Sequence, residues 1–206
     1  SLDDTITKFL PDSVAMNPAL QKITFKTLAN HTSGLPRLAD NIDKNPKFNQ
    51  ADPYALYDRK ALFSFLKHVK PARQPEEEFE YSNIGYGLLG ELISVISKKP
   101  YMQLMKEQLL TPLEMTNTSD KIDTKNKNIA KPYDKNGKEV AYWHFQALTS
   151  TGGLKSSLND LLRYTIAQLT FPETDIQRAM HLTKQFTFFI ARNNMSIETM
   201  FIFHFT

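Results

Sequence analysis

The chain has 206 residues, of which 41% are hydrophobic and 23% are charged, and its formal net charge is +3. This length supports a domain with a buried core, and so small a charge does not indicate a nucleic-acid partner. There is no cysteine, which excludes disulfide scaffolds, thiolate metal sites and cysteine nucleophiles. No apolar run is long enough to cross a bilayer, so no membrane span is expected in these residues. No phosphate loop, dinucleotide fingerprint or zinc helix occurs, and no cofactor is expected.

The first third of the chain predicts two helices. Residues 1–22 hold short apolar pieces broken by prolines, which indicates a loop-rich segment. Thr24 is expected to cap a short helix that ends near His31. Asp52 followed by Pro53 is typical of a helix start, and the apolar spacing predicts that this helix continues to about residue 69.

The middle of the chain predicts two consecutive helices, over residues 84–97 and about 101–110. Gly85, Gly87 and Gly90 lie on the first of them, where each glycine costs about 1 kcal/mol relative to alanine. Glycines kept at that cost indicate close packing of another segment against the helix.

A polar stretch over residues 117–139 separates these helices from the next. Within it, Asn136-Gly137 predicts a type I′ hairpin turn. The run from Ser157 to Asp160 predicts a capping box, which opens a helix to about residue 169.

Residues 171–206 differ in character from the rest. Six of the 14 phenylalanines lie in residues 186–206. Two interpretations of this tail stay open: a buried strand without its partners, or the product of a shifted reading frame.

Four short motifs follow one another along the chain. They are His31-Thr32-Ser33-Gly34-Leu35-Pro36, Tyr81-Ser82-Asn83, Pro112-Leu113-Glu114-Met115 and Gly152-Gly153-Leu154. This ordered set resembles the serine β-lactamase-related hydrolases, a family of class C β-lactamases, DD-carboxypeptidases and related esterases. The third motif departs from the family pattern, because Glu114 stands where the family has glycine. The resemblance covers residues 1–170, taken as a partial domain of this type, with residues 171–206 as a C-terminal helix and phenylalanine-rich tail that is divergent or frame-shifted.

The resemblance implies an α+β fold of the β-lactamase/transpeptidase type, of which this chain holds mainly the helical region and a partial antiparallel sheet. It implies acyl transfer on β-lactam, D-alanyl peptide or ester bonds, in an extracytoplasmic location and without a metal. Catalytic roles fall on Tyr81, which shares the proton transfer, and on Asn83, which orients the lysine and the substrate amide. Substrate binding falls on Ser82, Gly152 and Gly153. A phenol titrates near pH 10, so Tyr81 acts as a base only beside cations. His31 is expected to satisfy a backbone group within its turn.

The family nucleophile belongs to a Ser-x-x-Lys motif that precedes the first turn, which would place it before Ser1. Ser64-Phe65-Leu66-Lys67 has the spacing but follows the turn, and about one such match is expected by chance. Lys135-Asn136-Gly137 has the letters of the family's last motif but precedes the glycine pair that it should follow.

We therefore expect a portion of a serine hydrolase that is inactive alone and has its nucleophile elsewhere. Two alternatives stay open: a non-catalytic module that binds cell-wall peptides or another ligand, and a gene remnant without function.

Overall fold

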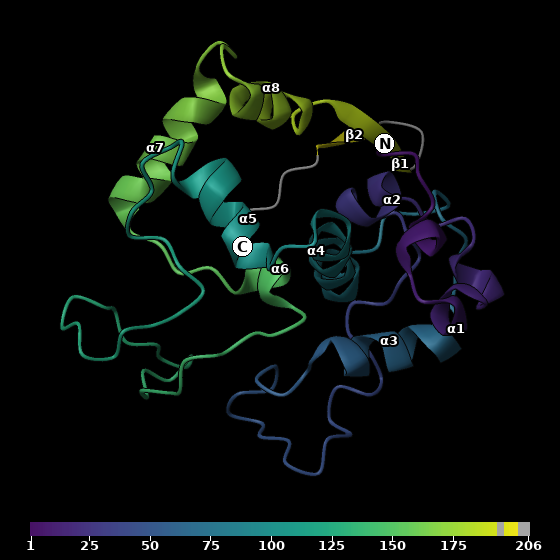
Figure 1. The fold of residues 1–206 in the computed structure, drawn as a ribbon, viewed down its shortest axis with the longest axis horizontal. Helices are drawn as coiled ribbons and strands as arrows, with labels where there is room; N and C mark the ends of the chain where they lie inside the picture. The colour runs from purple at the N-terminus through teal and green to yellow at the C-terminus, as the bar shows by residue number, and fades with distance from the viewer. Residues whose placement is uncertain (193–195, 202–206) are drawn as a thin grey trace.

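Helices are the main regular secondary structure of this chain, a computed structural model that describes residues 1–192 and 196–201 (Figure 1). The α-helices are α1 (Asp12–Ala15), α2 (Phe25–Ala29), α3 (Arg59–His68), α4 (Asn83–Ser97), α5 (Tyr101–Met105), α6 (Thr149–Gly152), α7 (Leu158–Leu169) and α8 (Asp175–Leu182). Three further helical turns are the 3-10 turns η1 (Ile6–Phe9) and η2 (Pro18–Leu20) and the π turn η3 (Lys106–Leu110), which continues α5. The helix predicted at 101–110 is thus confirmed. Residues 1–22, predicted to be loop-rich, instead hold three short helical pieces, η1, α1 and η2, joined by loops.

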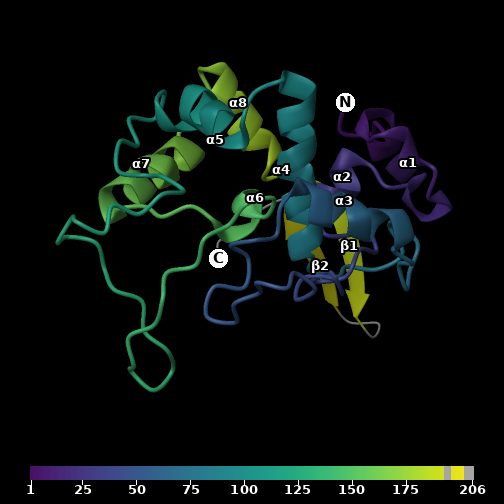
Figure 2. The ribbon, with the colours of Figure 1, turned by 60° about the horizontal axis from the view of Figure 1, so that its bottom comes forward.

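Two strands, β1 (Phe186–Arg192) and β2 (Ser196–Phe201), pair antiparallel, with Phe189 opposite Thr199. They lie beside the helices, as a view from another side shows (Figure 2). The predicted combination of a helical region with a partial antiparallel sheet is therefore confirmed. The end of the phenylalanine-rich tail, residues 202–206, lies outside the described residues.

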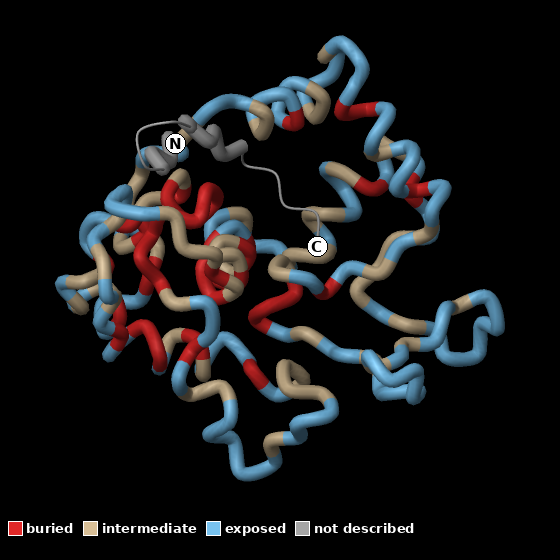
Figure 3. The backbone as a smooth tube through the Cα atoms, turned by 180° about the vertical axis from the view of Figure 1, so that it is seen from behind, coloured by how far each residue is buried: buried red, intermediate tan, exposed pale blue. Residues whose placement is uncertain are grey.

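The core is organised around α4. Ile84, Leu88 and Leu92 on this helix are fully buried, and α2, α5 and α6 all contact it. Buried residues concentrate here, whereas the long loops and much of α7 and α8 are exposed (Figure 3). The second motif stands at the N-terminal end of this central helix, so the core fixes its position.

The helix predicted to start at Asp52 begins six residues later than expected, which corrects that prediction. Asp58, not Asp52, is the N-cap of α3, and its side chain accepts a hydrogen bond from the backbone N–H of Ala61. The carboxylate of Asp52 instead accepts the backbone N–H of His144 at 2.8 Å and contacts its ring Nδ1 at 2.6 Å. The Asp52 side chain, which the local pattern assigned to a helix start, therefore binds a residue 92 positions away in the sequence.

The turn at Asn136-Gly137 is not of type I′, because Gly137 has a positive φ of 77° and Asn136 does not. The N–H of Gly137 donates to the carbonyl of Asp134, and the N–H of Asp134 donates to the carbonyl of Lys138. This is a three-residue hairpin connection closed by a left-handed glycine. The Asp134 carboxylate favours this turn over type I′, because it accepts hydrogen bonds from the backbone N–H groups of Asn136 and Lys138.

Asp160 links α7 to the polar stretch before it. Ser157 caps α7 as predicted, accepting the N–H of Asp160. The Asp160 carboxylate is fully buried and accepts hydrogen bonds from the N–H of Asn117 at 2.7 Å and the hydroxyl of Thr118 at 2.8 Å. Burial opposes ionisation of Asp160, but these hydrogen bonds outweigh it and hold its pKa below the usual range.

We expect Asp160→Asn to lower the free energy of unfolding by about 1–3 kcal/mol at pH 7, because an amide replaces a charged acceptor. A lowered pKa in the folded state stabilises the protein above the pKa of the unfolded chain, about 4, and this stabilisation is lost as the pH falls through the folded value. The difference between wild type and variant should therefore shrink below about pH 4. Urea unfolding across pH measures it, with the exposed Asp175→Asn as control. If the difference in unfolding free energy between wild type and Asp160→Asn stayed constant with pH, this role of the Asp160 carboxylate would be contradicted.

Candidate active site

The first motif forms a sharp, buried turn that follows α2. His31 and Gly34 both have positive φ angles, of 59° and 74°. A Cβ atom on Gly34 would lie 2.4 Å from the backbone oxygen of Arg73. The left-handed backbone and this close approach together require glycine at position 34.

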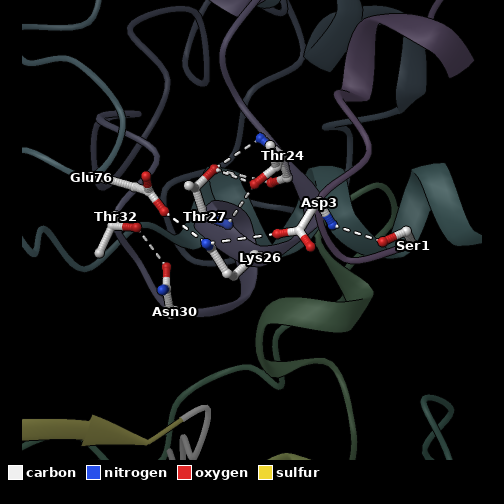
Figure 4. A network of polar contacts seen from close by, with 8 residues as sticks. All are labelled: Ser1, Asp3, Thr24, Lys26, Thr27, Asn30, Thr32 and Glu76. Carbon is white, nitrogen blue, oxygen red and sulfur yellow. Dashed lines mark hydrogen bonds and ion pairs between the residues drawn. The ribbon is translucent and has the colours of Figure 1, made fainter. Parts of the chain in front are cut away.

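Polar contacts hold the turn against the segment that leads to the second motif (Figure 4). The N–H of Glu76 donates to the carbonyl of Thr32 at 2.8 Å. The Glu76 carboxylate pairs with Lys26 of α2 at 2.9 Å, and the Thr32 hydroxyl donates to Asn30 at 2.6 Å. Thus α2, the turn and the segment after residue 73 are joined at one place.

His31 connects the turn to the second motif. Its buried ring lies 4.5 Å from the ring of Tyr81 and 4.6 Å from that of Tyr86, measured between centroids. Its Nδ1 accepts the backbone N–H of Ser82 at 3.1 Å, and its carbonyl accepts that of Glu80 at 2.8 Å. The His31 ring does satisfy a backbone group, but that group is the N–H of Ser82 in the second motif and not one of its own turn, which corrects that part of the prediction. Because Nδ1 accepts, it carries no proton in this arrangement.

Ser82 is buried, and its hydroxyl is engaged in the fold. Its Oγ accepts the N–H of Gly85 at 2.9 Å, which caps α4, and donates to the carbonyl of Pro36 at 2.8 Å. Through these two hydrogen bonds, the Ser82 hydroxyl joins the first motif to the start of α4. A substrate contact of Ser82 stays a prediction.

Asn83 is the first residue of α4, and the residues next to the first and fourth motifs hold its backbone. Its N–H donates to the carbonyl of Arg37 at 3.1 Å, and its carbonyl accepts the hydroxyl of Thr151 at 2.8 Å. Ser150 of α6 likewise donates to the carbonyl of Tyr86 at 2.7 Å. The backbone that carries the Asn83 side chain is therefore fixed from two sides.

Glycines on α4 allow α6 to approach this closely. A Cβ on Gly87 would lie 2.3 Å from the Leu148 side chain, and one on Gly90 would lie 2.2 Å from the Ser150 hydroxyl. The close packing expected of these glycines is confirmed. In the fourth motif, Gly153 is buried against the backbone of Thr149, whereas Gly152 is exposed.

Tyr81 precedes the cap of α4 and is partly buried. The guanidinium carbon of Arg37 lies over its ring, 5.4 Å from the centroid. Burial raises the pKa of Tyr81, and the positive charge of Arg37 opposes that rise. Sequence reasoning missed Arg37, although it directly follows Pro36 in the first motif.

The turn, the second motif and α6 thus form one unit built from residues 31–37, 81–86 and 149–153. The sequence of residues 1–196 matches the model of the Beta-lactamase family. The chain belongs to the Beta-lactamase family.

Two relatives among known proteins illustrate the similarity. The chain is 31% identical over 186 residues to Protein flp of Staphylococcus aureus (strain N315), covering 84% of this chain and 34% of that protein. It is 31% identical over 121 residues to the D-alanyl-D-alanine-carboxypeptidase/endopeptidase AmpH of Escherichia coli (strain K12), covering 57% and 30%. The chain thus spans about a third of the length of these relatives.

Solved structures show the same fold. A Beta-Lactamase/D-Alanine Carboxypeptidase from Pseudomonas syringae is 22% identical, with a TM-score of 0.76 over 98% of this chain and 52% of that one. A class C beta-lactamase mutant is 24% identical, with a TM-score of 0.78 over the same shares. The predicted β-lactamase/transpeptidase-like fold is confirmed for a chain of about half their length.

In the third motif, Glu114 stands where the family pattern has glycine. Glu114 has a positive φ of 55°, and the N–H of Met115 after it donates to the carbonyl of Leu110 at 2.8 Å. The left-handed conformation that glycine adopts without cost is therefore kept with a glutamate in its place.

The Ser-x-x-Lys match at Ser64 and Lys67 lies elsewhere. Both side chains are exposed on α3, and Ser64 lines a cavity formed with Pro36, Leu38, Asp40, Asn41 and the end of that helix. Neither Tyr81 nor Asn83 lines this cavity. Lys135-Asn136-Gly137 forms the exposed hairpin connection described above.

Two features are absent from residues 1–192 and 196–201, the described part of the chain. Among them, no group of three or more histidine, aspartate or glutamate side chains could hold a metal ion. None of their helices is both long and apolar enough for a membrane span.

Proposed function

We propose that this unit forms one wall of the acyl-transfer cleft of a serine hydrolase, whose nucleophile lies outside the 206 residues. The substrates are β-lactams, D-alanyl peptides or small esters, and the protein works outside the cytoplasm. Family membership and the names of the relatives, which include a D-alanyl-D-alanine-carboxypeptidase and class C beta-lactamases, support this proposal.

One observation carries the proposal further than resemblance does. His31 Nδ1 and the Pro36 carbonyl both bind Ser82, while the Arg37 carbonyl and the Thr151 hydroxyl both bind the backbone of Asn83. Two segments distant in sequence, residues 31–37 and 149–153, thereby fix Ser82 and Asn83, and Tyr81 directly precedes them. Such preorganisation is what proton transfer and substrate orientation require of a site.

In the proposed reaction, the serine hydroxyl oxygen attacks the substrate carbonyl carbon, and its proton passes to Tyr81 as phenolate or to the lysine amine. The proton then moves to the leaving nitrogen or oxygen as the scissile bond breaks, which leaves an acyl-enzyme. Water releases the acyl group by the same transfers. Asn83 orients the lysine and the substrate amide, and Gly152 and Gly153 border the cleft.

Covalent labelling of the 206-residue chain tests where the nucleophile lies. We expect no adduct with a fluorescent penicillin or a fluorophosphonate, as read by intact mass, in wild type or in a Ser64→Ala control. An adduct on wild type that Ser64→Ala abolishes would overturn the proposal. Saturable binding of an acetylated D-alanyl-D-alanine peptide without turnover, by the full-length gene product as well, would instead support a non-catalytic binding module.

A further inference from the structure

Arg37 is attached to the second motif through both its backbone and its side chain. Its carbonyl accepts the N–H of Asn83 at 3.1 Å, which fixes where the residue stands relative to α4. Its guanidinium carbon lies over the Tyr81 ring, 5.4 Å from the centroid. This distance falls within the range of a cation–π contact.

The other arginines whose side chains the structure describes all have a carboxylate partner. They are Arg59 with Glu91, Arg73 with Glu78 and Glu80, Arg163 with Asp160, and Arg178 with Asp175. No carboxylate of the described residues lies within ion-pairing distance of Arg37. Its exposed charge is therefore not neutralised by a neighbouring acid, and it acts on Tyr81 instead.

The other titratable groups near Tyr81 do not favour a phenolate there. The ring of His31 lies 4.5 Å away and accepts a hydrogen bond through Nδ1. Tyr54 opposes ionisation of Tyr81 electrostatically, raising its pKa, as burial also does. Burial raises the pKa of Tyr86 to about 12, and its hydroxyl donates to the carbonyl of Ala29. In the described part of the chain, Arg37 is the charged group that favours the phenolate.

We propose that Arg37 is a positioning residue for Tyr81, whose guanidinium holds the phenol ring and stabilises its phenolate. That this effect assists acyl transfer rests on the proposed function. The stabilisation of the Tyr81 phenolate by Arg37 does not. Arg37 acts through Tyr81 and the backbone of Asn83.

A pH titration of Tyr81 in the 206-residue chain tests the proposal without any substrate. Fluorine NMR of 3-fluorotyrosine-labelled protein is suitable, because fluorine makes the phenol more acidic and moves the titration to a milder pH. Tyr81→Phe identifies the signal. We expect Arg37→Leu to raise the Tyr81 titration midpoint by about half a pH unit or more, and Arg37→Lys to restore most of it.

Two controls separate a local charge effect from unfolding. Tyr101, whose pKa burial raises to about 12, should keep its midpoint in all variants, and 1 M NaCl should reduce the shift at Tyr81 because salt screens an exposed charge. If Arg37→Leu unfolds, Arg37→Gln takes its place.

An unchanged Tyr81 midpoint in a folded variant, or an equal shift at Tyr101, would overturn the proposal. If the titration shifts as expected but the full-length protein forms no acyl-enzyme, the proposed function fails and the electrostatic effect stands.

Discussion

Tyr81→Phe in the full-length protein that the gene encodes should lower kcat/KM for a β-lactam or D-alanyl peptide substrate about 10²–10⁴-fold, the usual contribution of a positioned general acid–base group. The variant keeps the ring that packs against His31 and lies under Arg37, and it loses only the hydroxyl. The folded structure should therefore persist while proton transfer is lost. Steady-state hydrolysis across pH, with the thermal midpoint measured in parallel, checks this result.

Tyr86→Phe is the matched control. Tyr86 also packs against His31, but its hydroxyl donates to the carbonyl of Ala29 at 2.7 Å. Removing that buried bond should cost about 1 kcal/mol of stability and leave kcat/KM nearly unchanged well below the melting temperature. Equal losses of activity in the two variants would show that packing, not chemistry, accounts for the effect of Tyr81.

Gly34→Ala should have the largest effect on stability, lowering the free energy of unfolding by about 3–5 kcal/mol. The left-handed φ of 74° disfavours alanine, and its Cβ would lie 2.4 Å from the Arg73 carbonyl oxygen. Relieving that contact would move the turn away from the segment that leads to Tyr81. Urea unfolding of the 206-residue chain measures the loss.

Gly137→Ala separates the two causes. Gly137 has a similar φ of 77°, but no atom lies within 4 Å of an added Cβ. Only the backbone penalty remains there, about 1–2 kcal/mol. The account of the turn would fail if both alanine variants were destabilised to the same degree.

Local patterns predicted the elements whose stabilising contacts are also local. The apolar spacing of α4 and the Thr24 cap of α2, where the cap and Thr27 contact each other reciprocally, are both found in the structure. The order of the motifs also indicated correctly that a turn, a helix start and a glycine pair belong to one family fold.

Prediction from local sequence failed where a side chain binds a residue far away in the sequence instead of a near neighbour. Asp52 binds His144 instead of starting a helix, and Asp160 binds residues 117–118 instead of completing a capping box. Nothing within a few residues of Asp52 or Asp160 signals either contact. The position of Arg37 over Tyr81 is of the same kind, because it depends on how the first turn meets α4.

The location of the nucleophile tests the central claim most directly. Labelling the full-length gene product with a fluorescent penicillin, followed by peptide mapping of the adduct, measures it in one experiment. We predict a single acylated serine, in a Ser-x-x-Lys motif outside residues 1–206, that is acylated more slowly in the Tyr81→Phe variant. An adduct on Ser64, or acylation at an unchanged rate without the Tyr81 hydroxyl, would contradict this account.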